Sequence, residues 1–208
     1  MNYISLLIIG FIVGLSGAML PGPMLIYTIS KVMQGSVISG IKIVFGHMLV
    51  EVVAITLILL GLKEIIGSRI ISTLLSLIGG LALIMMGLYI IFKATHIRLP
   101  RDTKVNFSFG LIAGGIFFTA FNPTFPTWWV TIGASLLSKA LLSGIIGVVI
   151  LTVGHWLADL AWFGSVSFAV CKGKSLLNDR IYRVVLRILG VAVIGLGVYF
   201  IILLFAMM

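Results

Sequence analysis

Long runs without a charged residue dominate this sequence, and they determine what it can fold into. Residues 1–30 contain no Lys, Arg, Asp or Glu, and residues 105–138 contain none either. A helix needs about 20 mostly apolar residues to cross the ~30 Å hydrocarbon core of a bilayer. Only 9% of the 208 residues are charged, whereas soluble domains carry roughly 25%. The sequence therefore predicts an all-α polytopic membrane protein with the lipid bilayer as its partner.

The charged residues divide the chain into six expected transmembrane helices. These are expected at residues 1–30, 43–62, 70–92, 105–138, 141–170 and 188–208. The loops after the first, third and fifth helices hold eleven of the 14 Lys and Arg residues, which is typical of the cytoplasmic side. We therefore expect a multi-pass protein of the plasma membrane with both termini outside. The net charge of +9 is explained by these loops, and no nucleic-acid partner is expected.

The two halves of this single transmembrane domain, residues 1–208, share a pattern. A shift of 100 residues superimposes three residues of the first expected helix on Gly110, Gly114 and Pro123, namely Gly10, Gly14 and Pro23. A shift of 108 superimposes Gly46, His47 and Glu51 on Gly154, His155 and Asp159. The pattern predicts two three-helix repeats, 1–93 and 105–208, joined by a basic cytoplasmic linker at 94–104. Because each repeat has an odd number of helices, the second is inverted, as in many secondary transporters.

The first and fourth helices each contain two prolines close together. Proline removes a backbone donor and clashes with the preceding turn, so SGAMLPGPMLIY and TAFNPTFPTWW predict broken helices. Breaks at matching positions of two repeats indicate a binding site near the bilayer midplane, and a half-helix N-terminus favours an anion. The expected substrate-binding residues are Pro21, Gly22, Pro23, Asn122, Pro123 and Pro126.

Two similar stretches, GHMLVEVVAI at 46–55 and GHWLADLAWF at 154–163, carry ionisable residues inside hydrophobic helices. Residues four apart lie on one helix face, so His47 is expected to reach Glu51 and His155 to reach Asp159. Charged groups are costly at this depth and usually line a polar pathway. The two pairs are therefore predicted to couple protons or bind a cation, with a structural hydrogen bond as the alternative.

At these residues the sequence resembles the LysE/RhtB family of amino-acid exporters. The resemblance rests on six spans in about 200 residues, Gly22-Pro23 late in the first, Glu51 in the second and Asn122-Pro123 in the fourth. It implies export of amino acids or related small zwitterions from the cytoplasm, driven by protons, with Glu51 as the key acid. His47, His155 and Asp159 are not part of the family pattern.

Two other functions remain open at this point. The four His and acid side chains suit a divalent metal as cargo, and a membrane scaffold without cargo would keep them as structural bonds. No Walker, HExxH, GxSxG or CxxC motif is present, so we expect no enzyme, no cofactor and no resident metal. The sequence is compatible with a monomer or a homo-oligomer.

Overall fold

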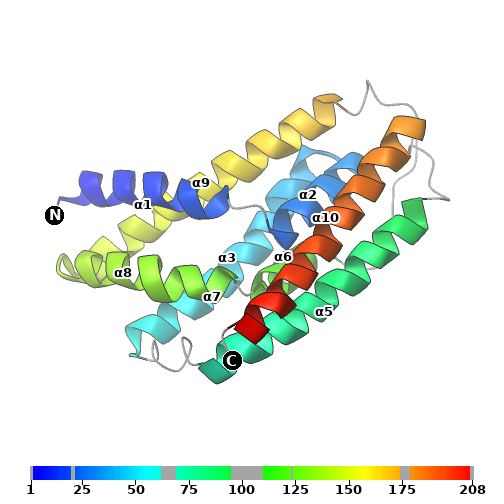
Figure 1. Cartoon of the computed structure of the whole chain (residues 1–208). Helices are drawn as coiled ribbons and strands as arrows, with labels where there is room; N and C mark the ends of the chain where they lie inside the picture. Colours follow the sequence, from blue (N-terminus) through cyan, green and yellow to red (C-terminus); the bar gives the residue numbers. More distant parts are fainter. Residues whose placement is uncertain are drawn as a thin grey trace.

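The structure is a computed structural model that describes residues 2–19, 22–61, 69–94, 110–122, 124–173 and 179–206. Regular structure in these residues is helical, and no strand occurs among them (Figure 1). The elements are α1 (Tyr3–Ala18), α2 (Pro23–Gln34), α3 (Val37–Leu59), α5 (Arg69–Ala94), α6 (Leu111–Ala120), α7 (Thr124–Trp128), the π-helix η1 (Trp129–Gly133), α8 (Ala134–Leu141), α9 (Gly144–Gly173) and α10 (Asp179–Ala206).

Two described helices, α3 and α9, are long and apolar enough to cross a membrane. The bent pair of α1 and α2 raises this number to three if it forms one broken span. Helices α5 and α10 have 26 and 28 residues, which exceeds the ~20 that a span needs. The chain is thus an all-helical membrane protein in the part that the structure describes, and six spans remain a prediction.

Both long uncharged runs are interrupted close to their prolines. Helices α1 and α2 meet at 81° across the first interruption, and the second separates α6 from α7. Pro23 and Pro126 both lie in the first turn of a new helix, where proline is tolerated because its missing N–H has no helical partner. Each interruption therefore precedes these prolines. Pro21 and Pro123 lie outside the described residues.

The loop between α2 and α3 is shorter than the charges indicate. Lys42 was expected in this loop, but α3 already begins at Val37. The reason is a capping box: the Ser36 side chain accepts from the Ser39 amide, while the Ser39 hydroxyl accepts from the Ser36 amide. These bonds satisfy amides that a helix start leaves free. The helix therefore begins five residues before Lys42, which the positions of the charges did not predict.

Glycines allow two helix pairs to approach closely: α1 packs along α9, and α6 packs along α3. A Cβ at Gly10 would overlap with the carbonyl oxygen of Leu151, and one at Gly115 with that of Ile43. Leu151 and Ile43 are themselves 108 residues apart. By these contacts Gly10 corresponds to Gly115, a shift of 105 residues, and not to Gly110, a shift of 100. The helix before the second interruption, α6, is therefore offset by five residues from the position that the sequence shift predicts.

Gly154→Ala is expected to destabilise the protein by about 1–3 kcal/mol, the usual cost of overpacking. The new methyl group would overlap with the carbonyl oxygen of Leu7 on α1. Gly164→Ala on the same helix is the matched control, since a Cβ there meets nothing within 4 Å. Thermal unfolding of the purified protein measures both variants, and equal stability of the two would contradict this packing.

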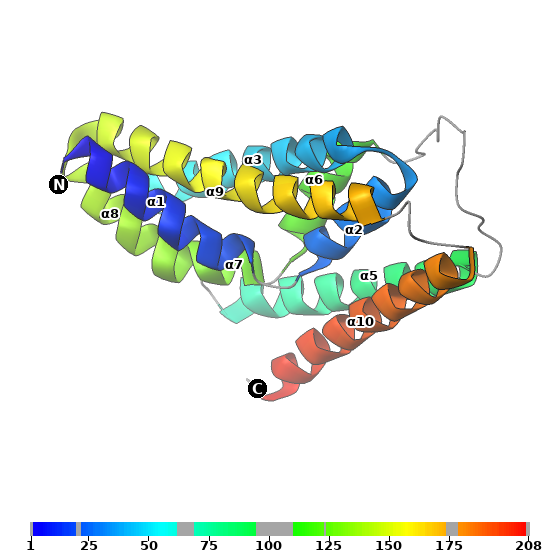
Figure 2. The same ribbon diagram turned by 90° about the horizontal axis from the view of Figure 1, so that it is seen from above.

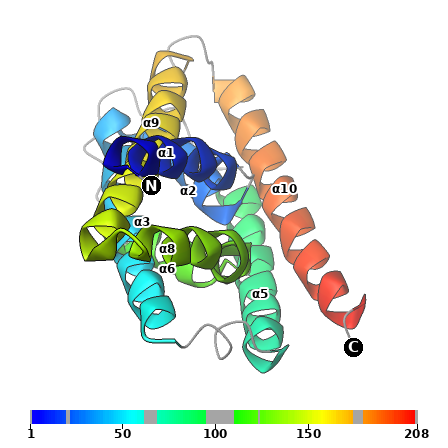
Figure 3. The same cartoon turned by 90° about the vertical axis from the view of Figure 1, so that its left-hand side faces the viewer.

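Helices α5 and α10 pack against each other at one side of the molecule (Figures 2 and 3). Their contact is antiparallel and reciprocal. Gly80 faces the carbonyl oxygen of Gly197 and the side chain of Ile201, while Gly190 faces that of Gly87 and the side chain of Ile91. Gly80 and Gly190 are 110 residues apart, as are Ile91 and Ile201. The repeat pattern in the sequence did not predict a role for these glycines.

Two clusters of buried apolar side chains surround the crossing of α3 and α9. One includes Ile55 and Leu151, and the other includes Ile43 and Phe163. Ile43 and Leu151 are 108 residues apart, and so are Ile55 and Phe163. Between the clusters lie the His and acid side chains, so the packing of apolar residues fixes two long helices on either side of the polar groups.

Candidate functional site

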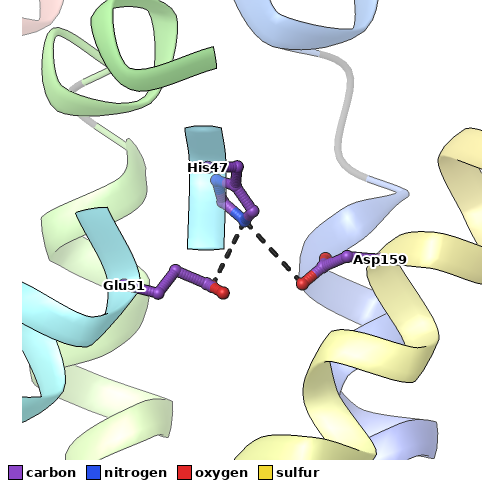
Figure 4. Close-up of side chains that lie close together, drawn as sticks. All are labelled: His47, Glu51 and Asp159. Carbon is purple, nitrogen blue, oxygen red and sulfur yellow. Dashed lines mark ion pairs between the residues drawn. The ribbon is translucent and has the colours of Figure 1, made fainter. Parts of the chain in front are cut away.

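Four ionisable side chains meet where α3 crosses α9. Glu51 and Asp159 are each 1% exposed, and His155 is 6% exposed. Figure 4 shows His47 and Glu51 on α3 pointing toward Asp159 on α9. Charge buried to this extent is stable only when it is paired or hydrogen-bonded. The four residues therefore form one cluster, which we call the His–acid cluster.

Glu51 is the best-satisfied member of the His–acid cluster. Its Oε1 lies 2.8 Å from Nε2 of His155, and its Oε2 accepts a 2.9 Å hydrogen bond from the indole of Trp156. Nε2 of His47 lies 3.2 Å from the same Oε1. A carboxylate only accepts hydrogen bonds, so these three donors stabilise Glu51 as an anion.

Asp159 is different. Its Oδ2 lies 3.7 Å from Nε2 of His155 and 3.8 Å from Nε2 of His47, beyond hydrogen-bond distance. In the described part of the chain this buried oxygen has no hydrogen-bond partner. The sequence predicted that each His would pair with the acid on its own helix. His47 does pair with Glu51, at 3.2 Å. His155 lies closer to Glu51, at 2.8 Å, than to Asp159 on its own helix, because the two helices cross at this level.

The two imidazoles are held by different neighbours. Nδ1 of His47 lies 2.9 Å from the hydroxyl of Thr119 on α6, and that hydroxyl lies 3.7 Å from the sulfur of Met24. His155 is flanked by aromatic rings, with centroids 5.0 Å from Trp128 and 5.3 Å from Trp129. His155 is therefore held by packing against two rings, whereas His47 is held by a hydroxyl group.

A cavity of about 70 Å³ connects the cluster with both helix interruptions. A site needs about 10–15 Å³ of such volume to hold one water, so several waters or a small polar solute fit. The lining residues come from both halves of the chain: Gly17, Ala18, Met24, His47, Glu51, Asn122, Thr124, Phe125, Trp128, Trp129, His155, Asp159 and Phe163.

The expected substrate-binding residues are not all brought to this cavity. Asn122 lines it, whereas Gly22, Pro23 and Pro126 are not among its lining residues. The side chain of Asn122 also caps α7, since its Oδ1 accepts from the amide and the hydroxyl of Thr124. Gly22 caps α2 without a side-chain hydrogen bond. Of the two half-helix N-termini, only that of α2 lacks a side-chain cap.

The model of the LysE type translocator family matches residues 15–204. The chain belongs to this family. No curated protein and no solved structure gave a significant match. The family match agrees with the resemblance drawn from Gly22-Pro23, Glu51 and Asn122-Pro123, and it identifies the protein as a membrane transporter.

Several residues that contact the translocator's His–acid cluster carried no clear signal in the sequence. Trp128, Trp156 and Thr119 are not among the residues that the sequence predicts for the site. The π-helix η1, which places Trp129 beside His155, was not predicted. π-helical turns often occur at functional sites. The two tryptophans could have been flagged, because each adjoins a predicted feature: Trp156 follows His155, and Trp128 follows the second interruption.

The translocator's cluster also offers ligand atoms for a metal ion. One atom each from His47, Glu51 and Asp159 lies within 4.8 Å of the others. To bind an ion, however, the imidazole Nε2 must be free of its hydrogen. Nε2 of His155 lies at hydrogen-bonding distance from Oε1 of Glu51. This oxygen could therefore coordinate an ion only by losing its bond to His155.

Trp156→Phe is expected to lower the translocator's free energy of unfolding by about 1.5–3 kcal/mol, the usual worth of a hydrogen bond to a charged group. Trp162→Phe on the same helix is the matched control. It removes the same atoms, but in the described part of the chain the Trp162 indole N–H has no partner. Thermal unfolding in detergent measures both, and an equal loss for the two variants would show that the bond to Glu51 is not what matters.

Proposed function

We propose that this translocator exports a small zwitterion, of the amino-acid class, from the cytoplasm in exchange for protons. The observation that carries the proposal is the cavity, because it joins the His–acid cluster to both helix interruptions. The cargo's carboxylate is proposed to bind at the N-terminus of α2, near Gly22 and Pro23, where the positive end of the helix dipole favours an anion. Its ammonium group would face Glu51 or Asp159.

Proton coupling is proposed to use the same acids. A carboxylate that binds either a proton or an ammonium group, but not both at once, exchanges one for the other. His47 and His155 would hold the protons that the acids release, because imidazole changes its protonation in the physiological range. A buried cluster separated from bulk water would then release its proton only when the cargo arrives.

We also propose that the chain forms six spans as two inverted three-helix repeats, 1–93 and 105–208. Three sets of contacts support this. Gly10 and Gly115 face carbonyl oxygens of residues 108 apart, the His–acid pairs share that shift, and the glycines of α5 and α10 contact each other reciprocally. Alternating access would then move one bundle against the other, with both termini outside the plasma membrane and the linker 94–104 in the cytoplasm.

The second interruption has a different proposed role from the first. Asn122 already caps α7, so it is proposed to bind cargo only after the cap opens, with Pro123 and Pro126 keeping the helix start in place. Pro21 is proposed to do the same for α2. Transport of a divalent metal by the cluster is less well supported, because His155 and Trp156 already occupy Glu51.

Proteoliposomes with an imposed pH gradient test this function. Each of the twenty amino acids is added in turn, and then a set of divalent metals, while proton movement is followed. We expect at least one amino acid to accelerate the collapse of the gradient with wild-type protein. A response to metals alone would show that the cargo is a metal ion and not an amino acid. No response from correctly folded protein would contradict proton-coupled export.

A further inference from the structure

Two buried polar atoms in the cavity lack a hydrogen-bond partner, and they are of opposite kinds. One is Oδ2 of Asp159, which accepts, and the other is Nε1 of Trp128, which only donates. Both residues line the cavity, and none of the residues that the structure describes satisfies either atom. A buried polar group without a partner is costly, so each atom indicates a missing group of the opposite kind.

An amino acid offers both missing groups at once. We propose that Asp159 binds the ammonium group of the cargo, that the indole of Trp128 donates to its carboxylate, and that Glu51 is a fixed anion. This inference rests on the proposed function and decides between the two acids that it leaves open. The cargo class is then a primary amine that also carries an anionic oxygen.

Glu51 is unsuited to the cargo because its oxygens are in use. His155 occupies Oε1 at 2.8 Å and Trp156 occupies Oε2 at 2.9 Å. An incoming ammonium would have to displace a donor that is already in place. At Asp159 it would meet an oxygen that has no hydrogen bond within the described residues and lies 3.7 and 3.8 Å from the two imidazoles. The same ammonium would lie near two imidazoles that point their donors at Glu51, which leaves Asp159 as the acceptor.

The matching positions of the two halves explain why the acids differ. The residue 108 positions before Trp156 is Met48, which lies with Trp156 in one apolar groove between α3 and α9. Methionine has no N–H or O–H to donate. Asp159 therefore lacks the counterpart of the hydrogen bond that Trp156 donates to Glu51. Because methionine stands at the matching position, Asp159 is left free to bind a ligand.

A second difference affects the imidazoles. His47 is fixed by Thr119, whereas the residue 105 positions before Thr119 is Gly14, next to His155. Glycine offers His155 no hydroxyl group. His155 is held instead by Glu51 and by the rings of Trp128 and Trp129. The cargo's two proposed ligands, Trp128 and Asp159, thus both lie on the His155 side of the cluster.

Ligand-induced thermal stabilisation of the purified full-length protein tests the inference. The twenty amino acids and methylammonium are the probes. The amino acid that stabilises wild type most is then compared with its 2-hydroxy acid, which lacks the amine, and with its decarboxylated amine. Wild type should bind each analogue roughly 10- to 100-fold more weakly, as expected when a hydrogen bond to a charged group is lost.

The variants separate the two roles. Asp159→Asn should reduce the preference for the amino acid over its 2-hydroxy acid to less than about threefold, since the amine loses its charged partner. Trp128→Phe should reduce the preference over the decarboxylated amine in the same way. Asp159→Glu should keep the preference for the amino acid over its 2-hydroxy acid. This result would show that the loss in Asp159→Asn does not come from misfolding. Trp162→Phe is the control, because its indole also lacks a partner but does not line the cavity.

The outcomes distinguish this inference from the function on which it rests. If wild type binds an amino acid and Asp159→Asn keeps the full preference for the amine, or if Glu51→Gln alone abolishes it, the inference is overturned while the function stands. If no amino acid and no methylammonium stabilises folded wild type, both are overturned. Loss of the two preferences in the two predicted variants supports both.

Discussion

Glu51→Leu is expected to lower the free energy of unfolding by about 3–5 kcal/mol, the cost of removing one partner from a buried charged network. The reason is that Glu51 accepts from His155 and Trp156 and lies 3.2 Å from His47. Without the carboxylate these donors lose their acceptor. Unfolding of the purified protein by heat or by SDS measures the loss.

Asp159→Leu is the matched comparison, because it removes the other acid from the same cluster. Oδ2 of Asp159 has no hydrogen bond within the described residues, so its removal should cost far less than removal of Glu51. A loss as large as that of Glu51→Leu would show that the two acids are equally bound and would contradict the asymmetry of the cluster.

Replacing all four ionisable residues by apolar ones is expected to leave a folded protein that does not transport. The variant carries Leu at positions 47, 51 and 155 and Val at position 159. Exchange of a complete buried ionic network for apolar residues is often neutral or stabilising by about 1–4 kcal/mol. Transport should disappear, because no group remains to bind a proton or an ammonium.

This variant separates a functional cluster from a structural one. Transport is measured as cargo-dependent proton flux in proteoliposomes, and folding as thermal unfolding of the same preparation. A scaffold that uses the cluster only for stability would keep its function here. Retained transport in the apolar variant would therefore contradict a role for the cluster, whereas a folded but inactive protein agrees with it.

The candidate site could be predicted from the sequence because its signals are local. The double prolines predicted an interruption in each long uncharged run, and both interruptions lie close to the predicted positions. The repeated Gly-His pattern identified His47, Glu51, His155 and Asp159, since charge inside apolar helices is rare. The structure brings these four residues together at one cavity.

The internal arrangement of the site could not be predicted, because it depends on how two helices cross. Spacing along one helix links His155 to Asp159, but the crossing places its Nε2 at 2.8 Å from Glu51. The same holds for Trp156, whose hydrogen bond depends on the depth at which α9 meets α3. Gly115 was not predicted for a related reason: a sequence shift cannot show which of Gly110, Gly114 and Gly115 faces the other helix.

Proton movement in proteoliposomes is the most direct test of proton-coupled export. Wild type and the fourfold apolar variant are reconstituted side by side, a pH gradient is imposed, and the amino acids are added one at a time. We expect at least one amino acid to collapse the gradient with wild type and none to do so with the variant. A gradient that no amino acid disturbs with folded wild type, or one that both proteins collapse equally, would contradict export driven through the His–acid cluster.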